Sequence, residues 1–205
     1  MNNTTDINPF TNLGQPGCDI GLQEDLNVLF LVGSSGSPTH QCIIPSDIKI
    51  LFPLVNVVCN SLEAPPFFGQ TEQAQRECSN NFIDTAFNLT LKIGGKTISN
   101  LEQYRLDSPP GGFEFEAVQG NLFLTPPGEG TGVSDGYWIL LKLSPGQHQI
   151  SFQGSLNATE LVRQPFIFTA GATYNLDVKP AEKSYYPNDY QQNYPNDYQQ
   201  NYPIY

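Results

Sequence analysis

Basic residues are scarce in this sequence. The chain of 205 residues has 9 Lys and Arg against 20 Asp and Glu, which gives a formal net charge of −11. Proteins that bind nucleic acid gather basic side chains against the phosphate backbone, so this composition argues against nucleic acid as a partner. Long apolar runs are missing too. Because a helix needs about 20 consecutive apolar residues to cross a bilayer, no membrane span is expected.

Motifs for catalysis and cofactor binding are also missing. The chain contains neither a Gly-x-Ser-x-Gly elbow nor a phosphate-binding loop or dinucleotide fingerprint. Of its two histidines, His40 lies in a Ser/Gly/Pro-rich stretch that predicts a loop. His148 lies at an inward position of a predicted strand, where a structural role is expected. The sequence therefore predicts a protein that is not an enzyme and holds no metal or cofactor.

Cysteines are few, and none of them forms a close Cys-x-x-Cys pair, the spacing that structural zinc sites usually have. Cys18, Cys42, Cys59 and Cys78 all lie in the first 80 residues. Of the three possible disulfide pairings, we expect Cys18–Cys42 and Cys59–Cys78, because these close short consecutive loops. Disulfides form in oxidising compartments, so the pairing indicates an exported protein.

Export also agrees with the glycosylation signals of the chain. Four Asn-x-Ser/Thr tripeptides, at Asn2, Asn3, Asn88 and Asn157, are candidate sites for N-glycosylation. The segment Met1–Asp6 lacks the charged and apolar regions of a signal peptide. Either a signal was removed or export uses another route, and in both cases the expected location is extracellular or on the cell surface.

Turn-forming residues, by contrast, are abundant. The 18 Gly and 17 Pro separate short apolar runs, which favours a mainly β fold, an antiparallel β-sandwich or jelly roll with nine to eleven strands. One short helix is predicted from Glu72 to about Asn80, with Thr71 as its N-cap. Residues 18–180 would form this domain, and residues 1–17, rich in Asn, Thr, Pro and Gly, an extended arm.

A predicted hairpin from Ser134 to Phe152 lies at the centre of the expected domain. Its turn, Ser144-Pro145-Gly146-Gln147, has Pro and Gly at the positions typical of a type II turn. Trp138, Ile150 and Phe152 are expected in the core. Further hairpins are predicted at Gly94-Gly95 and within residues 165–178, and the apolar run 28–32 indicates a strand buried on both faces.

The C-terminal segment, residues 181–205, is a low-complexity tail with a tandem repeat. Tyr-Pro-Asn-Asp-Tyr-Gln-Gln-Asn starts at Tyr186, repeats from Tyr194 and begins again at Tyr202. Such a segment has too few apolar residues to bury a core, and its Tyr/Asn/Gln bias is typical of segments that associate by stacking and amide hydrogen bonds. The candidate assembly residues are the repeat tyrosines Tyr186, Tyr190, Tyr194, Tyr198 and Tyr202.

Several stretches taken together resemble a group of uncharacterised exported proteins of bacteria and archaea, over residues 18–178. The resemblance implies export, both disulfides and a β fold, and it transfers no catalytic residue. The tail is not part of the pattern. The stretches are Cys42–Pro45, Ile50–Asn56 with Cys59, Tyr104-Arg105 with Ser108-Pro109, and Ser134–Trp138 with Leu143–His148.

Two functions follow from these features. The first is a non-catalytic exported structural protein that self-assembles into a filament-like extracellular polymer, with the arm and the tail making the subunit contacts. The alternative is a carbohydrate-binding or adhesive β-sandwich, for which Asp135, Tyr137 and Trp138 are the candidate glycan contacts because they place a carboxylate beside two aromatic rings.

Overall fold

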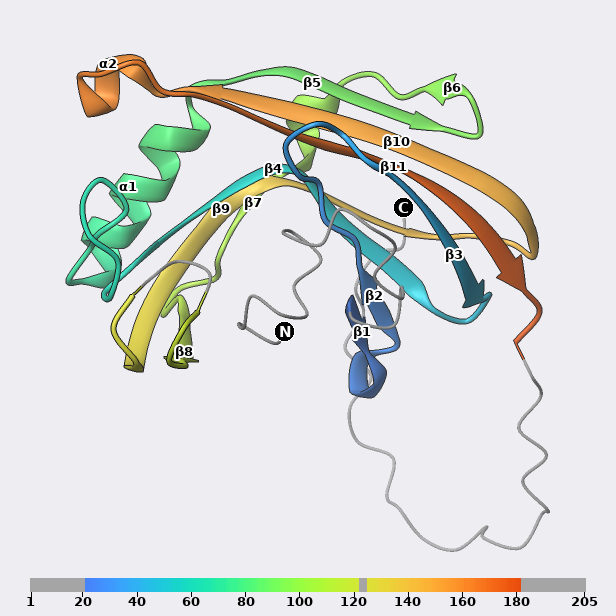
Figure 1. The fold of residues 1–205 in the computed structure, drawn as a ribbon, viewed down its shortest axis with the longest axis horizontal. Coiled ribbons are helices and arrows are strands. Elements are labelled where there is room, and N and C mark those ends of the chain that lie inside the picture. Colours follow the sequence, from blue (N-terminus) through green and yellow to red (C-terminus); the bar gives the residue numbers. More distant parts are fainter. Residues whose placement is uncertain (1–20, 122–124, 182–205) are drawn as a thin grey trace, which may run out of the picture.

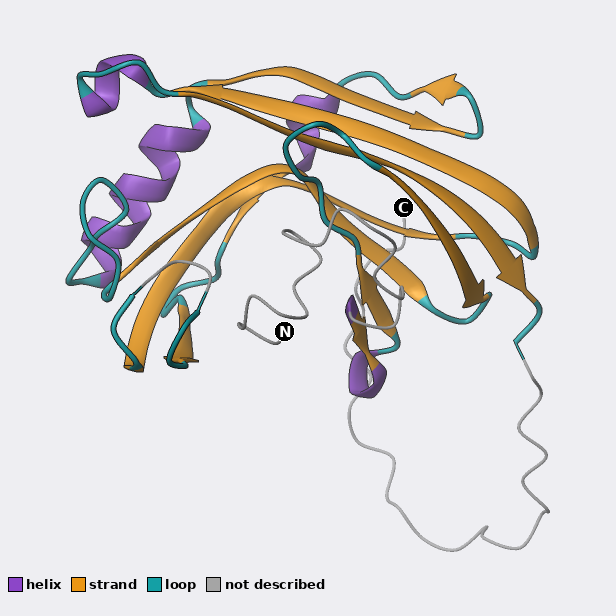
Figure 2. Cartoon of the chain, viewed as in Figure 1, coloured by secondary structure: helices purple, strands orange, loops and turns teal. Residues whose placement is uncertain are grey.

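The computed structural model describes residues 21–121 and 125–181 (Figure 1). They form a mainly β protein with two mixed sheets and few helices (Figure 2). The predicted arm, Cys18 and the repeat tyrosines lie outside the described residues, as do Asn2 and Asn3.

The first sheet has β4 and β9 at its centre, and the second has β10 and β11. The order in the first sheet is β1-β2-β4-β9-β7, with β8 also paired to β9, and the order in the second is β3-β11-β10-β5-β6. The bounds in the first sheet are β1 Leu22–Gln23, β2 Val28–Phe30, β4 Lys49–Asn60, β7 Arg105–Asp107, β8 Phe113–Ala117 and β9 Gly128–Lys142. Those in the second are β3 Thr39–Pro45, β5 Ala86–Ile93, β6 Lys96–Thr97, β10 Gly146–Asn157 and β11 Ile167–Lys179.

Each sheet contains one parallel pair, so the predicted antiparallel arrangement is only partly right. β2 runs parallel to β4, and β3 runs parallel to β11. The chain leaves the first sheet after β2, forms β3 in the second sheet and then returns as β4. Two reversals of direction between β2 and β4 leave these neighbours parallel, which no local pattern in the sequence reveals.

The main core lies between the two sheets. Phe52 of β4 stacks on Phe152 of β10 with ring centroids 4.6 Å apart, and Ile50 and Ile150 of the same strands are fully buried. A β-bulge between Pro53 and Val55 keeps the buried residues of β4 on one face along its whole length. Pro53 lies at this bulge, where a residue without a backbone N–H is tolerated in a central strand.

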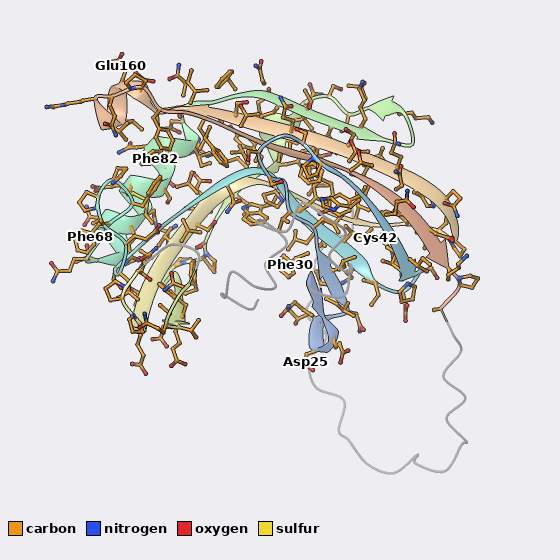
Figure 3. All side chains as sticks on the ribbon, in the orientation of Figure 1. Asp25, Phe30, Cys42, Phe68, Phe82 and Glu160 are labelled. Atoms are coloured by element: carbon orange, nitrogen blue, oxygen red, sulfur yellow. A yellow bond between two sulfur atoms is a disulfide. The ribbon has the colours of Figure 1, made fainter. Side chains whose placement is uncertain are left out.

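Helix α1, Glu72–Ile83, packs against β4 and β9 where the sheets diverge (Figure 1). Its N-cap is Thr71 as predicted, since the Thr71 hydroxyl accepts a hydrogen bond from the Ala74 N–H. The helix continues past Asn80 because Phe82 and Ile83 are buried in a second apolar cluster with β4 and β10 (Figure 3). A second helix, α2 (Thr159–Val162), was not predicted, and two 3-10 turns cover Glu24–Leu26 and Leu101–Tyr104.

The predicted hairpin from Ser134 to Phe152 is wrong. Gly146 has the expected positive φ, 139°, but β9 belongs to the first sheet and β10 to the second. Turn residues specify a reversal of the chain and not the sheet that the next strand joins. Because both strands carry an apolar inner face, they pack face to face across the core instead of pairing edge to edge.

The hairpin predicted within residues 165–178 is wrong as well, because β11 is one continuous strand. Its central Gly171 exchanges two backbone hydrogen bonds with Ser34, at 3.0 and 3.1 Å. A Cβ on Gly171 would lie 2.7 Å from the carbonyl oxygen of Phe152, so glycine marks a close approach of backbones there and not a turn. At Gly94-Gly95 the predicted hairpin is confirmed by the pairing of β5 with β6.

Candidate functional site

The candidate glycan contacts lie on β9, where successive side chains point to opposite faces of the first sheet. Asp135 and Tyr137 are on the inner face with the buried Ile139, and Tyr137 packs against both apolar clusters. Trp138 is on the outer face and is half-buried, so the prediction that it belongs to the core is wrong. The structure does not bring the three side chains together on one surface.

Asp135 is only 1% exposed and is held by Arg105 of β7. The Arg105 guanidinium donates to Asp135 Oδ2 from Nη2 at 2.7 Å and from Nε at 3.0 Å, and from Nη1 to Asp84 Oδ1 at 2.6 Å. These carboxylates raise the pKa of Arg105 above its ordinary value, chiefly through the hydrogen bonds to Asp135. With its amide nitrogen turned toward the acceptors, Asn80 adds a donor 3.1 Å from Asp135 Oδ2. The acceptors of Asp135 are thus used within the fold.

A second arginine, Arg76, ties α1 to the loop after β7. Its guanidinium pairs with Glu72 on the same helix at 2.8 Å and with Asp107 of β7 at 2.5 Å. It also donates to the carbonyl oxygen of Ser108 at 2.9 Å. Unlike Asp135, both acidic partners are partly exposed, so this pairing is screened by water. The two arginines fix α1 on the inner face of the first sheet. The sequence did not reveal this role, because the partners that cross between elements, Asp107 for Arg76 and Asp135 for Arg105, are distant in the chain.

The two histidines lie on strands of the second sheet. His148 binds the carbonyl oxygen of Ser144 at 2.8 Å and so braces the turn before β10. His40 lies on β3 and not in the predicted loop, and it is buried against the Tyr174 ring with centroids 4.7 Å apart. Burial lowers the pKa of His40 and raises the pKa of Tyr174 to about 12. The Tyr174 hydroxyl donates to the carbonyl oxygen of Val32 at 2.9 Å.

The outer face of the first sheet is apolar over four strands. Register places Phe30 beside Leu51, Leu51 beside Leu140, and Pro53 beside Trp138. Two of its residues are strongly exposed, Leu106 at 65% and Leu140 at 59%. No helix or strand of the described residues lies across it (Figure 1). We call this surface the apolar outer face, and it comprises Phe30, Leu51, Pro53, Leu106, Trp138 and Leu140.

Two lysines border the apolar outer face at the end of the sheet where β4 begins. Lys49 of β4 lies directly opposite Lys142 of β9, and both side chains are exposed. Within the described residues neither lysine forms an ion pair. Like charges that face each other on neighbouring strands repel, and an anionic group placed between the two lysines would relieve this repulsion.

Only some of the predicted disulfide cysteines and glycosylation sites lie within the described residues. The disulfide Cys59–Cys78 is confirmed, with Cys59 fully buried, and it fits an oxidising, extracellular environment. Cys42 is disulfide-bonded as well, and its predicted partner Cys18 lies outside the described residues. Both remaining candidate glycosylation sites, Asn88 on β5 and Asn157 at the end of β10, are exposed.

No protein-family model, curated protein or solved structure matches this chain. The resemblance of residues 18–178 to exported proteins therefore stays a prediction from motifs. Among residues 21–121 and 125–181, no group of three or more His, Cys, Asp or Glu side chains could hold a metal ion. No described helix has the length and apolar character needed to cross a bilayer.

Proposed function

We propose that the protein is an exported, non-catalytic structural protein that self-assembles into a filament-like polymer outside the cell or on its surface. The observation that carries the proposal is the apolar outer face. Strands with apolar residues on both faces are typical of sheets covered on both sides, and large exposed apolar patches mark interaction surfaces. A second copy of the chain would supply the missing cover.

The body of each subunit would be a disulfide-tied β-sandwich, with the sheets as its two layers. The stacking of Phe52 on Phe152 between the sheets supports this assignment, as does the close approach of Leu54 to Gly154. The Cys59–Cys78 disulfide supports export. In this proposal the arm, residues 1–17, and the tail, residues 181–205, mediate contacts between subunits.

Self-association of the oxidised full-length chain tests the proposal. We expect sedimentation velocity to show oligomers that grow with protein concentration, and negative-stain microscopy to show elongated particles. The double variant Leu106→Thr/Leu140→Thr should shift the protein toward monomer, because it removes the two most exposed apolar side chains of the face while keeping β-forming residues.

The matched control is Ile43→Thr, since Ile43 is 71% exposed but lies on β3 in the second sheet. We expect this variant to assemble like the unmodified protein. A chain that stays monomeric at all concentrations, or equal effects of the control and the double variant, would contradict the proposal.

The alternative, glycan binding through Asp135, Tyr137 and Trp138, has less support. Asp135 is engaged by Arg105, and Trp138 lies on the opposite face of the sheet from the other two. A glycan array with signal that is lost in the Trp138→Ala variant would favour this alternative over assembly.

A further inference from the structure

The tail leaves the described fold beside the two lysines that border the apolar outer face. β11 ends at Lys179, whose carbonyl oxygen accepts a hydrogen bond from the Ser46 N–H at 2.8 Å. The Ala181 N–H donates to the Ser46 hydroxyl at 3.1 Å. Ser46 precedes β4 by three residues, and β4 begins with Lys49. The chain therefore enters residues 182–205 at the same end of the molecule as the facing lysines.

The repeat of the tail is chemically matched to this surface. Each Tyr-Pro-Asn-Asp-Tyr-Gln-Gln-Asn unit carries two tyrosines, one proline and one aspartate. Tyrosine and proline rings bury well against apolar and aromatic side chains such as Leu140 and Trp138. The aspartates supply the negative charge that Lys49 and Lys142 lack within the described fold.

We propose that the apolar outer face of one subunit, with Lys49 and Lys142 at its border, is the docking site for the octapeptide-repeat tail of a second copy. The inference rests on the proposed self-assembly and names the contact that produces it. The Pro in each repeat opposes a continuous ladder of backbone hydrogen bonds, so the tail binds across the face through its side chains and does not add a strand.

The proposed self-assembly makes a second copy, and not the subunit's own face, the recipient of the tail. β11 and β3 run parallel, and after β3 the chain reverses through Ser46–Ile48 to enter β4. β11 therefore ends beside the start of β4, and its arrow in Figure 1 points to the end of the molecule at which β3 also ends. A neighbouring subunit placed at this end of the molecule would receive the tail. A tail-to-face contact of this kind is heterologous and builds open filaments when it does not close into a ring.

Trp138 provides the readout, because it is the only tryptophan of the chain and lies within the proposed docking site. The receiving protein is the oxidised full-length chain with Tyr186, Tyr190, Tyr194, Tyr198 and Tyr202 all changed to Ser, so that its own tail cannot compete. A synthetic peptide of residues 185–205, which contains no tryptophan, is titrated into it. We expect a saturable blue shift of Trp138 emission and protection from acrylamide quenching.

Three variants of the receiving protein locate the site. Leu140→Thr and the double variant Lys49→Glu/Lys142→Glu should each weaken peptide binding at least about 10-fold, since each removes apolar contact or reverses the bordering charge. Ile43→Thr should leave binding unchanged. Absence of a Trp138 response, or equal weakening by Ile43→Thr, would overturn the inference. So would a response to a peptide of residues 1–17 that exceeds the response to the tail peptide.

Sedimentation of the unmodified and the five-tyrosine variant chains separates this inference from the proposed function. If the unmodified chain forms oligomers and the variant does not, both stand. If both chains form the same oligomers and the peptide does not bind, the tail contact fails while self-assembly stands. If the unmodified chain stays monomeric with Trp138 protected at every concentration, the tail covers its own subunit, which overturns the second-copy contact and the proposed assembly together.

Discussion

The outer faces of the two sheets differ sharply in chemistry. On the second sheet, outward side chains pair with one another across strands: Gln149 donates to Asn175 at 2.9 Å, and Thr173 donates to Ser151 at 3.1 Å. The polar side chains of such a face form hydrogen bonds with one another and with solvent. On the first sheet, four strands carry apolar side chains on the outer face, beside the polar Lys49, Asn56, Ser134 and Lys142, and Leu106 and Leu140 are mostly exposed. The second sheet also exposes Ile43 and Ile167, at 71% and 69%, but these two lie far apart in the register, whereas the apolar side chains of the first sheet are neighbours.

The same difference is visible along the central strands of the first sheet, which carry apolar side chains on both faces. β4 and β9 use their inner faces to build the core and carry Leu51, Pro53, Trp138 and Leu140 on the other side. Strands of the second sheet alternate between apolar and polar, as half-exposed strands do. If the inner faces carry the fold and the apolar outer face only binds, substitutions on the two sides should have separable effects.

The largest loss of stability is expected when the inner face of the first sheet is left with an unpaired charge. Arg105→Met removes the main partner of Asp135 and should lower the free energy of unfolding by about 3–5 kcal/mol. Arg76→Met is the matched control, because its acidic partners are partly exposed, and it should cost about 0–1 kcal/mol. Urea denaturation followed by circular dichroism measures both. Equal losses would show that burial of Asp135 does not control the effect.

A smaller loss is expected where the two inner faces approach most closely. A Cβ on Gly154 of β10 would lie 2.7 Å from the carbonyl oxygen of Leu54. Gly154→Ala must therefore push the sheets apart and should cost about 1–3 kcal/mol. Gly95→Ala, in a turn with open space around it, is the comparison, and its cost arises only from the positive φ of 78°. Thermal unfolding of both variants reports the difference, and an unaffected Gly154→Ala protein would contradict close packing of the sheets.

A modest pH dependence is expected from His40, which is buried on the inner face of the second sheet. Burial lowers the pKa of His40 below its ordinary value of 6.5, so the unfolded chain takes up a proton more readily than the folded one. The stability that neutral His40 contributes is present above that pH and falls as the pH decreases toward the folded pKa, by at most about 1.4 kcal/mol per pH unit. His40→Phe should remove this component of the pH profile measured by urea denaturation, and an unchanged profile would contradict it.

The smallest effect on stability is expected on the outer faces. Leu106→Thr on the first sheet and Ile43→Thr on the second should each change the free energy of unfolding of the monomer by less than about 0.5 kcal/mol. The two faces would then be equal in stability and would differ only in association. A loss above about 1 kcal/mol for Leu106→Thr alone, measured at concentrations where the protein is monomeric, would place that residue in the fold and break the distinction.

The features that the sequence predicted correctly depend on contacts between near neighbours. The Thr71 cap needs only the N–H group three residues later, and the Gly94-Gly95 hairpin needs only two residues with positive φ, 57° and 78°. The disulfide between Cys59 and Cys78 closes a loop of 19 residues, short enough for spacing to suggest it. The core positions of Ile150 and Phe152 are confirmed as well, whereas His148 on the same strand is only partly buried.

The candidate site could be predicted only in part. The adjacency of Asp135, Tyr137 and Trp138 suggested a shared surface, yet alternation along β9 places Trp138 on the other face, and Arg105 engages Asp135 across 30 positions. A usable signal for the apolar outer face was present, since the run Tyr137–Leu141 has apolar residues at every position. What covers such a face cannot be deduced from a strand alone.

By itself the sequence determined the mainly β class, the first helix, one disulfide and the repeating tail, because each depends on propensity, turn chemistry or spacing along a short stretch. Only the tertiary structure decided that β9 and β10 belong to different sheets, that β11 is one strand, and that Arg105 neutralises Asp135. Those outcomes depend on which apolar surfaces meet in the folded chain. That choice is made between residues far apart in sequence, where the free energy of burial and not local geometry decides.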